Sequence, residues 1–166
     1  MAGENPALLA GCEETETATM ADRLTLELEQ KTAEAILETP RNQLTGWRLL
    51  DDRGLTAQED GSVTLPLPDD FLRLYCVRLK GWARSVTETS AHDSPEALLQ
   101  THPVKGLRAS AARPLAVIHP DGDGRCLRLH GAHADPPEIE EGWYMPAPRI
   151  DADGFIDTCN CRPLKP

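Results

Sequence analysis

Residues near the C-terminal end of the sequence are of the types that bind calcium, and their spacing decides whether they do. Residues 151–157 read Asp-Ala-Asp-Gly-Phe-Ile-Asp, with the spacing found in the middle of a calcium-binding loop. Aligning Gly154 with the turn glycine of such a loop puts Arg149 at the first ligand position and Asn160 at the position of the bidentate acid. A cation and an amide cannot supply these two ligands. We therefore interpret the stretch as an Asp-Gly turn.

The sequence has five cysteines, two of which lie close together. Cys159 and Cys161 are separated by one residue, whereas a closed zinc site needs four ligands, usually in pairs separated by two to four residues. The odd count and irregular spacing favour five free thiols in a reducing cytoplasm. Folding would have to recruit any further ligands, for which the candidates are Cys126, His130 and His133. We predict no metal site and no cofactor.

Side chains for acid–base or nucleophilic catalysis lack a recognisable context. The sequence has no Gly-x-Ser-x-Gly motif and no glycine-rich phosphate-binding loop. Single histidines beside loops are usually solvated, and this applies to His119, His130 and His133. Four carboxylates, Asp135, Glu138, Glu140 and Glu141, lie close together in the sequence on a proline-containing loop. Such a cluster is typical of a solvated face. We predict that the protein is not an enzyme and has no catalytic residues.

Length and charge limit the remaining function classes. The chain has 166 residues, enough for one ordinary domain, with 27 acidic and 17 basic residues and a net charge of −10. This charge argues against a protein that binds nucleic acid through its phosphates. No apolar run approaches the roughly 20 residues that span a bilayer, and the first residues lack the basic start of a secretory signal. We therefore expect neither membrane insertion nor sequence-specific nucleic-acid binding.

The first third of the chain predicts an acidic tail and then a helical segment. Residues 1–18 are small, polar and acidic, and we expect them to be disordered. The segment 19–50 is predicted to be helical up to Thr39-Pro40, followed over residues 41–50 by a short helix or by a turn that leads to a strand. A helix of about twenty residues is marginal alone in water, so it should dock on the rest of the chain or pair with another copy. Its candidate subunit interface is the apolar face of Met20, Leu24, Leu28 and Ile36.

The most strongly patterned stretch is residues 65–82, LPLPDDFLRLYCVRLKGW. Its two prolines favour an extended start, and residues 72–79 favour a strand. Strict alternation would place Leu72, Leu74 and Cys76 on one face and Tyr75, Val77 and Leu79 on the other. Both faces are largely apolar, which predicts a central strand that is covered on both sides.

The remaining elements predict a β-rich core over residues 51–160, with a C-terminal stub at 161–166. Strands are expected at 63–67, 115–118, 126–130 and 143–145, with a hairpin turn at 121–124 and a loop at 131–142. A short helix at 95–100 is capped by Ser94. The predicted fold class is α+β, with an N-terminal amphipathic helix before a mainly antiparallel β-core that carries a short inserted helix. The predicted core residues are Phe71, Leu74, Val77, Leu115, Val117, Leu127 and Leu129.

Two phrases of this sequence resemble a known family. Residues 65–82 resemble the LP-x-DF-x-R-L strand of head-to-tail adaptor proteins of tailed phages and prophages, the neck proteins of the tail tubular protein A kind. Residues 143–151, WYMPAPRID, resemble the Y-x-P-x-P-x-I-D end of the same β-region. The resemblance covers residues 24–160.

This resemblance implies a structural virion protein that forms a ring between portal and tail. Its partners would be the portal and tail proteins and further copies of itself, first in the bacterial cytoplasm and then in the virion neck. In the family, further helix normally follows the β-region. Residues 161–166 stand where that helix would begin, so we expect the apolar face of the N-terminal helix to lack this partner. That face consists of Met20, Leu24, Leu28 and Ile36.

A small β-rich module that binds a ligand or carbohydrate is the alternative function. Its platform would be formed by aromatic side chains, for which the candidates are Trp47, Trp82, Trp143 and Tyr144. The same side chains could instead belong to the core. Exposure of two tryptophans on one face would favour the binding module.

Overall fold

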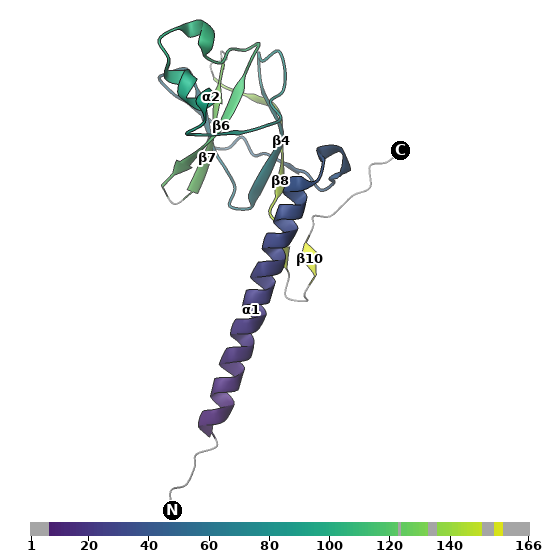
Figure 1. Cartoon of the computed structure of the whole chain (residues 1–166). Coiled ribbons are helices and arrows are strands. Elements are labelled where there is room, and N and C mark those ends of the chain that lie inside the picture. The colour runs from purple at the N-terminus through teal and green to yellow at the C-terminus, as the bar shows by residue number, and fades with distance from the viewer. Residues whose placement is uncertain (1–6, 123, 133–135, 151–154, 158–166) are drawn as a thin grey trace, which may run out of the picture. The chain divides into compact units, whose positions relative to one another are not determined.

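The structure, a computed structural model, describes residues 7–122, 124–132, 136–150 and 155–157 (Figure 1). The chain divides into two compact units. The first combines the described residues of the ranges Met1–Leu44 and Pro148–Asn160, and the second comprises Thr45–Ala147. The predicted α+β class is confirmed. The predicted boundaries at 50 and 160 differ from this division, because the residues that follow Ala147 group with the helix.

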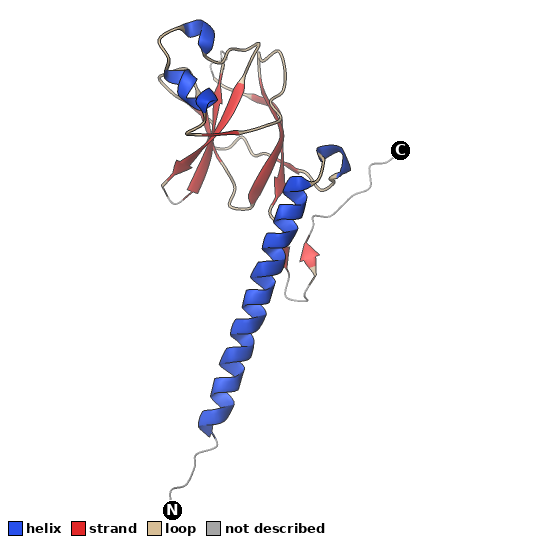
Figure 2. Ribbon diagram, in the orientation of Figure 1, coloured by secondary structure: helices blue, strands red, loops and turns tan. Residues whose placement is uncertain are grey.

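The first unit consists of a long helix and a small two-stranded sheet. Helix α1 spans Ala7–Glu38, and strands β9 (Arg149–Ile150) and β10 (Ile156–Asp157) pair antiparallel (Figures 1 and 2). The helix ends before Pro40, as predicted. Helix α1 starts at Ala7, inside the range 1–18 for which disorder was expected. Residues 7–10 read Ala-Leu-Leu-Ala, all strong helix formers.

The second unit contains two sheets. The smaller has the order β1 (Arg48–Leu49), β8 (Ile139–Pro146) and β4 (Phe71–Leu79). The larger has the order β2 (Thr56–Ala57), β3 (Val63–Pro66), β7 (Gly124–His130), β6 (Leu115–Asp121) and β5 (Ser90–Ala91), with only β5 and β6 parallel. The 3-10 helix Arg41–Gln43 precedes β1, so residues 41–50 contain both a short helix and the start of a strand.

The inserted helix lies between β5 and β6. Helix α2 spans Pro95–Leu98 and continues as 3-10 turns at Leu99–Thr101 and Lys105–Leu107. The Ser94 side chain accepts a hydrogen bond from the backbone N–H of Ala97 at 3.2 Å, which satisfies one free donor of the first turn. The predicted cap and helix are confirmed.

The stretch 65–82 links the two sheets, because β3 belongs to the larger and β4 to the smaller. Arg125 holds the corner between them. Its Nη2 donates to the carbonyl of Phe71 at 2.7 Å, and its guanidinium lies 5.8 Å from the centre of the Phe71 ring. The carbonyl of Arg125 accepts from the N–H of Leu67 at 2.9 Å. The proline-containing corner therefore leads the chain from one sheet to the other.

One apolar core is shared by both sheets. Five of the seven predicted core residues belong to it: Phe71, Leu74, Val77, Leu127 and Leu129. The prediction is wrong for Val117, which is buried outside this cluster, and for Leu115, which is only partly buried.

The reason for this error is the phase of β6. Val117 is paired with Arg128 on the neighbouring strand, and paired residues share one face of a sheet. Ala116, which is paired with Leu129, points into the core instead. A shift of one residue exchanges the two faces of a strand.

The structure also corrects the predictions for β4 and β8. The central strand of the smaller sheet is β8, and β4 lies at its edge. Register shifts interrupt β4, so that Cys76 and Val77 are both buried while Tyr75 is exposed. Strand β8 begins at Ile139, inside the range predicted to be a loop. Bulges add residues that strict alternation does not anticipate.

Candidate functional site

The predicted interface residues of α1 divide into two groups. Met20, Leu24 and Leu28 are exposed, with Met20 and Leu24 at 64% and 63% of their full surface. They are spaced by four residues and so follow one side of the helix, and we call them the first seam. Exposed large apolar side chains in such a row mark a surface suited to contact with another protein.

Ile36, the fourth residue of the predicted interface, does not belong to the first seam. At about 100° per residue, Ile36 lies roughly 160° around the helix from Met20 and only about 20° from Glu29. Glu29 faces β9, where its Oε1 accepts a hydrogen bond from the N–H of Ile150 at 2.8 Å. Ile36 is partly buried and lies on this covered side of the helix.

A second exposed apolar row runs along α1 and was missed in the sequence. Leu26 and Leu37 are both exposed and are eleven residues apart, close to three full turns. We call them the second seam. Leu26 lies roughly 160° around the helix from Leu24, so the two seams point in nearly opposite directions. The spacing of eleven was the available signal.

Residues of both seams and of the helix surface between them line a hollow of about 410 Å³. Its residues stand in the i, i+3, i+4, i+7 arrangement that receives a side chain of a neighbouring helix. Apolar residues line it together with Arg23, Glu27 and Gln30, and the apolar members are Met20, Leu24 and Leu26. At about 100° per residue, Arg23, Glu27 and Gln30 lie between Leu26 on one side and Met20 and Leu24 on the other, so polar side chains occupy the middle of the hollow.

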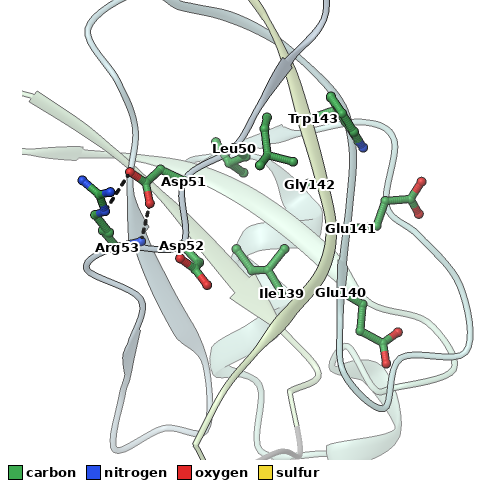
Figure 3. Close-up of a pocket in the computed structure, with 10 residues that line it drawn as sticks. Leu50, Asp51, Asp52, Arg53, Ile139, Glu140, Glu141, Gly142 and Trp143 are labelled. Atoms are coloured by element: carbon green, nitrogen blue, oxygen red, sulfur yellow. Dashed lines mark hydrogen bonds and ion pairs between the residues drawn. The ribbon is translucent and has the colours of Figure 1, made fainter.

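The second unit has a groove where β1 and β8 diverge (Figure 3). Its volume is about 510 Å³, and its walls are residues 49–53 on one side and 139–143 on the other. Leu50 is buried, and its N–H donates to the carbonyl of Gly142 at 2.9 Å. Glycine suits position 142, because an added Cβ would lie 3.2 Å from side-chain atoms of both Leu50 and Ile139, and these would have to shift slightly.

The groove is acidic, although part of its charge is balanced. Arg53 contacts Asp51, with Nε 3.5 Å from Oδ2 and its backbone N–H donating to Oδ1 at 3.0 Å (Figure 3). Glu140 lies 3.2 Å from the Nε of Arg78. Glu141 accepts from the neutral hydroxyl of Ser85 at 2.9 Å. The predicted acidic cluster thus lies partly on β8 and not wholly on a loop.

The proposed aromatic platform is not formed by all four candidates. Trp82 is buried and donates from Nε1 to the carbonyl of Gly131 at 3.0 Å. Tyr144 is buried too, and its hydroxyl donates to Asp70 at 3.1 Å; burial and this carboxylate raise the pKa of Tyr144. Trp143 is exposed, whereas Trp47 is partly buried with its ring 4.3 Å from that of Tyr75.

Two of the predicted loop histidines lie on strands of the larger sheet. His119 belongs to β6 and His130 to β7, and the sheet face of Arg128 carries both. Burial lowers the pKa of His119. Burial, with the nearby Arg128, lowers the pKa of His130 to about 4, against a smaller opposing effect of Asp60. His133 lies outside the described residues.

Acidification should therefore destabilise the second unit. Because the folded-state pKa of His130 is below its ordinary value of 6.5, the unfolded chain binds this proton more readily. Stability is retained above about pH 6.5 and should fall by about 1–3 kcal/mol as the pH drops to about 4. Urea titrations of the wild type and of His130→Asn measure this, with exposed His92→Asn as the control. An equally steep loss in His130→Asn would contradict the assignment.

The candidate metal ligands cannot all be placed. Residues 151–154 and 159–161 lie outside the described part of the chain, as does the side chain of Cys12. Cys76 and Cys126 are buried thiols. Within the described residues, no group of three or more histidine, cysteine, aspartate or glutamate side chains is arranged to hold a metal ion. Among the same residues, no helix combines the length and apolarity that crossing a membrane would require.

Comparison of the chain with family models, with curated proteins and with solved structures finds no match in any of the three.

Proposed function

We propose that the chain is a structural protein that assembles with further copies of itself through α1. Specifically, it would act as an adaptor in the neck of a tailed phage or prophage and join portal to tail. The observation that carries this proposal is the pair of exposed seams on α1. The resemblance of residues 65–82 and 143–151 to head-to-tail adaptors supports it independently.

The directions of the two seams favour a ring. A two-fold dimer uses the same patch on both copies, so a single seam would be enough. Two seams on nearly opposite sides allow the first seam of one copy to contact the second seam of the next. Such head-to-tail contacts close into a ring or continue as a filament.

The charge of the chain is compatible with a neck through which DNA passes. A net charge of −10 disfavours adhesion to a DNA backbone of the same sign. Assembly would take place in the bacterial cytoplasm, and the assembled ring would lie at the virion neck.

A module that binds a ligand or carbohydrate is the second candidate. The exposed ring of Trp143 at the groove favours it, since aromatic faces stack on sugars. Burial of Trp82 and Tyr144 removes half of the proposed platform.

Two variants test the assembly through α1. Leu24→Asp/Leu28→Asp disrupts the first seam, and Leu26→Asp/Leu37→Asp disrupts the second. Sedimentation velocity over a range of concentrations should show oligomers for the wild type and monomers for each variant. A charge inserted into an apolar interface costs more than the contact gains. Leu98→Asp, at an exposed leucine of α2, is the control and should assemble as the wild type does.

Mixing the two variants gives a sharper result. Each retains one intact seam, so the mixture should form a 1:1 heterodimer and no larger species. If the second-seam variant formed dimers alone, the contact would be two-fold and the ring model would be wrong. A wild type that stays monomeric at every concentration and salt would contradict assembly through α1.

A further inference from the structure

We propose that the groove beside β8 binds an extended, positively charged peptide segment of a partner protein. The groove is lined by residues 49–53 and 139–143, all within the second unit. The inference concerns a surface other than α1 and does not depend on assembly through the seams.

The groove exists because β1 is much shorter than β8. Strand β1 consists of Arg48 and Leu49, which pair with Tyr144 and Trp143 of β8, and the Leu50 N–H adds one further bond. The chain then turns away at Asp51. Within the described residues, no strand pairs with β8 between Ile139 and Glu141 on this side. An open strand edge of this kind is where an extended peptide can add a further strand.

Two apolar side chains stand at the end of the groove as anchors. Leu49 is exposed to 66% and Trp143 to 38%, although both lie in a regular strand. They are directly paired across β1 and β8, so their side chains share one face of the sheet. An exposed aromatic and aliphatic pair beside an open edge provides the pocket contacts that accompany strand addition.

Charge identifies the kind of partner. Four carboxylates and one cation line the groove: Asp51, Asp52, Glu140, Glu141 and Arg53. Arg53 and Arg78 contact Asp51 and Glu140. No cation among the described residues lies within ion-pair distance of Asp52 or Glu141. Lysine or arginine side chains of a bound segment would supply the missing charge and could also lie over the ring of Trp143.

The same carboxylates argue against a second copy of this chain as the occupant. The net charge of the chain is −10, and two acidic strand edges repel each other. Carboxylates on an edge strand protect it from pairing with another copy of the same edge. They do not repel a basic peptide.

Fluorescence anisotropy tests this with a labelled eight-residue peptide of alternating lysine and valine. A peptide of alternating glutamate and valine is the matched control. The basic peptide should bind, the acidic one should not, and binding should weaken about tenfold or more when NaCl is raised from about 0.05 M to about 0.5 M. Binding of both peptides alike, or of neither, would overturn the proposal.

Variants locate the site. Asp52→Asn/Glu141→Gln should weaken binding of the basic peptide about tenfold or more and reduce its salt dependence, and Trp143→Ala should weaken binding about tenfold. Glu96→Gln and Leu98→Ala change an acid and an exposed leucine on α2 and should leave binding unchanged. Equal losses in all variants would mean non-specific attraction and would overturn the proposal.

A neutral oligosaccharide such as cellohexaose tests the other candidate ligand of the groove, a carbohydrate. If it bound through Trp143 while the basic peptide did not, the groove would be a sugar site and the peptide proposal would be wrong. Because no variant here touches α1, a failure at the groove leaves the oligomeric state as a separate test of the proposed function.

Discussion

Leu74→Ala should lower the free energy of unfolding of the second unit by about 2–5 kcal/mol. Leu74 is only 2% exposed and belongs to the core shared by the two sheets. Its truncation removes apolar contacts and leaves a cavity that the two sheets cannot close without moving together. Urea titration followed by tryptophan fluorescence measures the change.

The matched control is Leu98→Ala, which truncates an exposed leucine of α2. This change should stay within about 0.5 kcal/mol of the wild type. A loss below about 0.5 kcal/mol for Leu74→Ala as well would mean that Leu74 is not in the core. The strand phase assigned to β4 would then be wrong.

Gly131→Ala should cost about 2–4 kcal/mol, through both backbone strain and a steric clash. Gly131 has a φ of +93°, which side chains rarely adopt. An added Cβ would lie 2.7 Å from the backbone C and O of Ser110, so the neighbouring loop would have to move. The carbonyl of Gly131 also accepts from Trp82, so a shift would weaken that bond.

Gly61→Ala separates the cost of backbone strain from the cost of the steric clash. Gly61 also has a positive φ, +78°, but nothing lies within 4 Å of the added Cβ. Strain alone should therefore cost this variant about 1–2 kcal/mol. Thermal unfolding of both variants measures the difference. Equal losses would show that the contact with Ser110 contributes nothing.

Signals carried by adjacent residues predicted the local structure well. Ser94-Pro95 correctly predicted the start of α2, and Thr39-Pro40 the end of α1. The turn at 121–124 joins β6 and β7 as expected, with Asp121 paired to Gly124. These features depend on proline geometry, side-chain caps and turn preferences, all of which act within a few residues.

Long-range pairing could not be predicted in the same way. The position of β4 at a sheet edge depends on which strands meet β8, and the alternation of β4 is broken by register shifts. The phase of β6 follows from its register with β7, where Val117 faces Arg128. An apolar run such as residues 115–118 does not indicate which face is inward.

The same contrast between local and long-range features applies to the candidate surfaces. Three of the four predicted α1 interface residues form one exposed seam, because their spacing is local. Ile36 lies on the side of α1 that β9 covers, and this side depends on a segment distant in sequence. The groove could not be predicted at all, since residues 49–53 and 139–143 come together only in the fold.

Negative-stain electron microscopy of the chain mixed with its cognate portal protein tests the proposed adaptor role most directly. We expect rings of this chain bound to one end of the portal. The double variant Leu24→Asp/Leu28→Asp should leave bare portals, and Leu98→Asp should still form rings. Bare portals with the wild-type chain at every salt concentration would contradict the proposal.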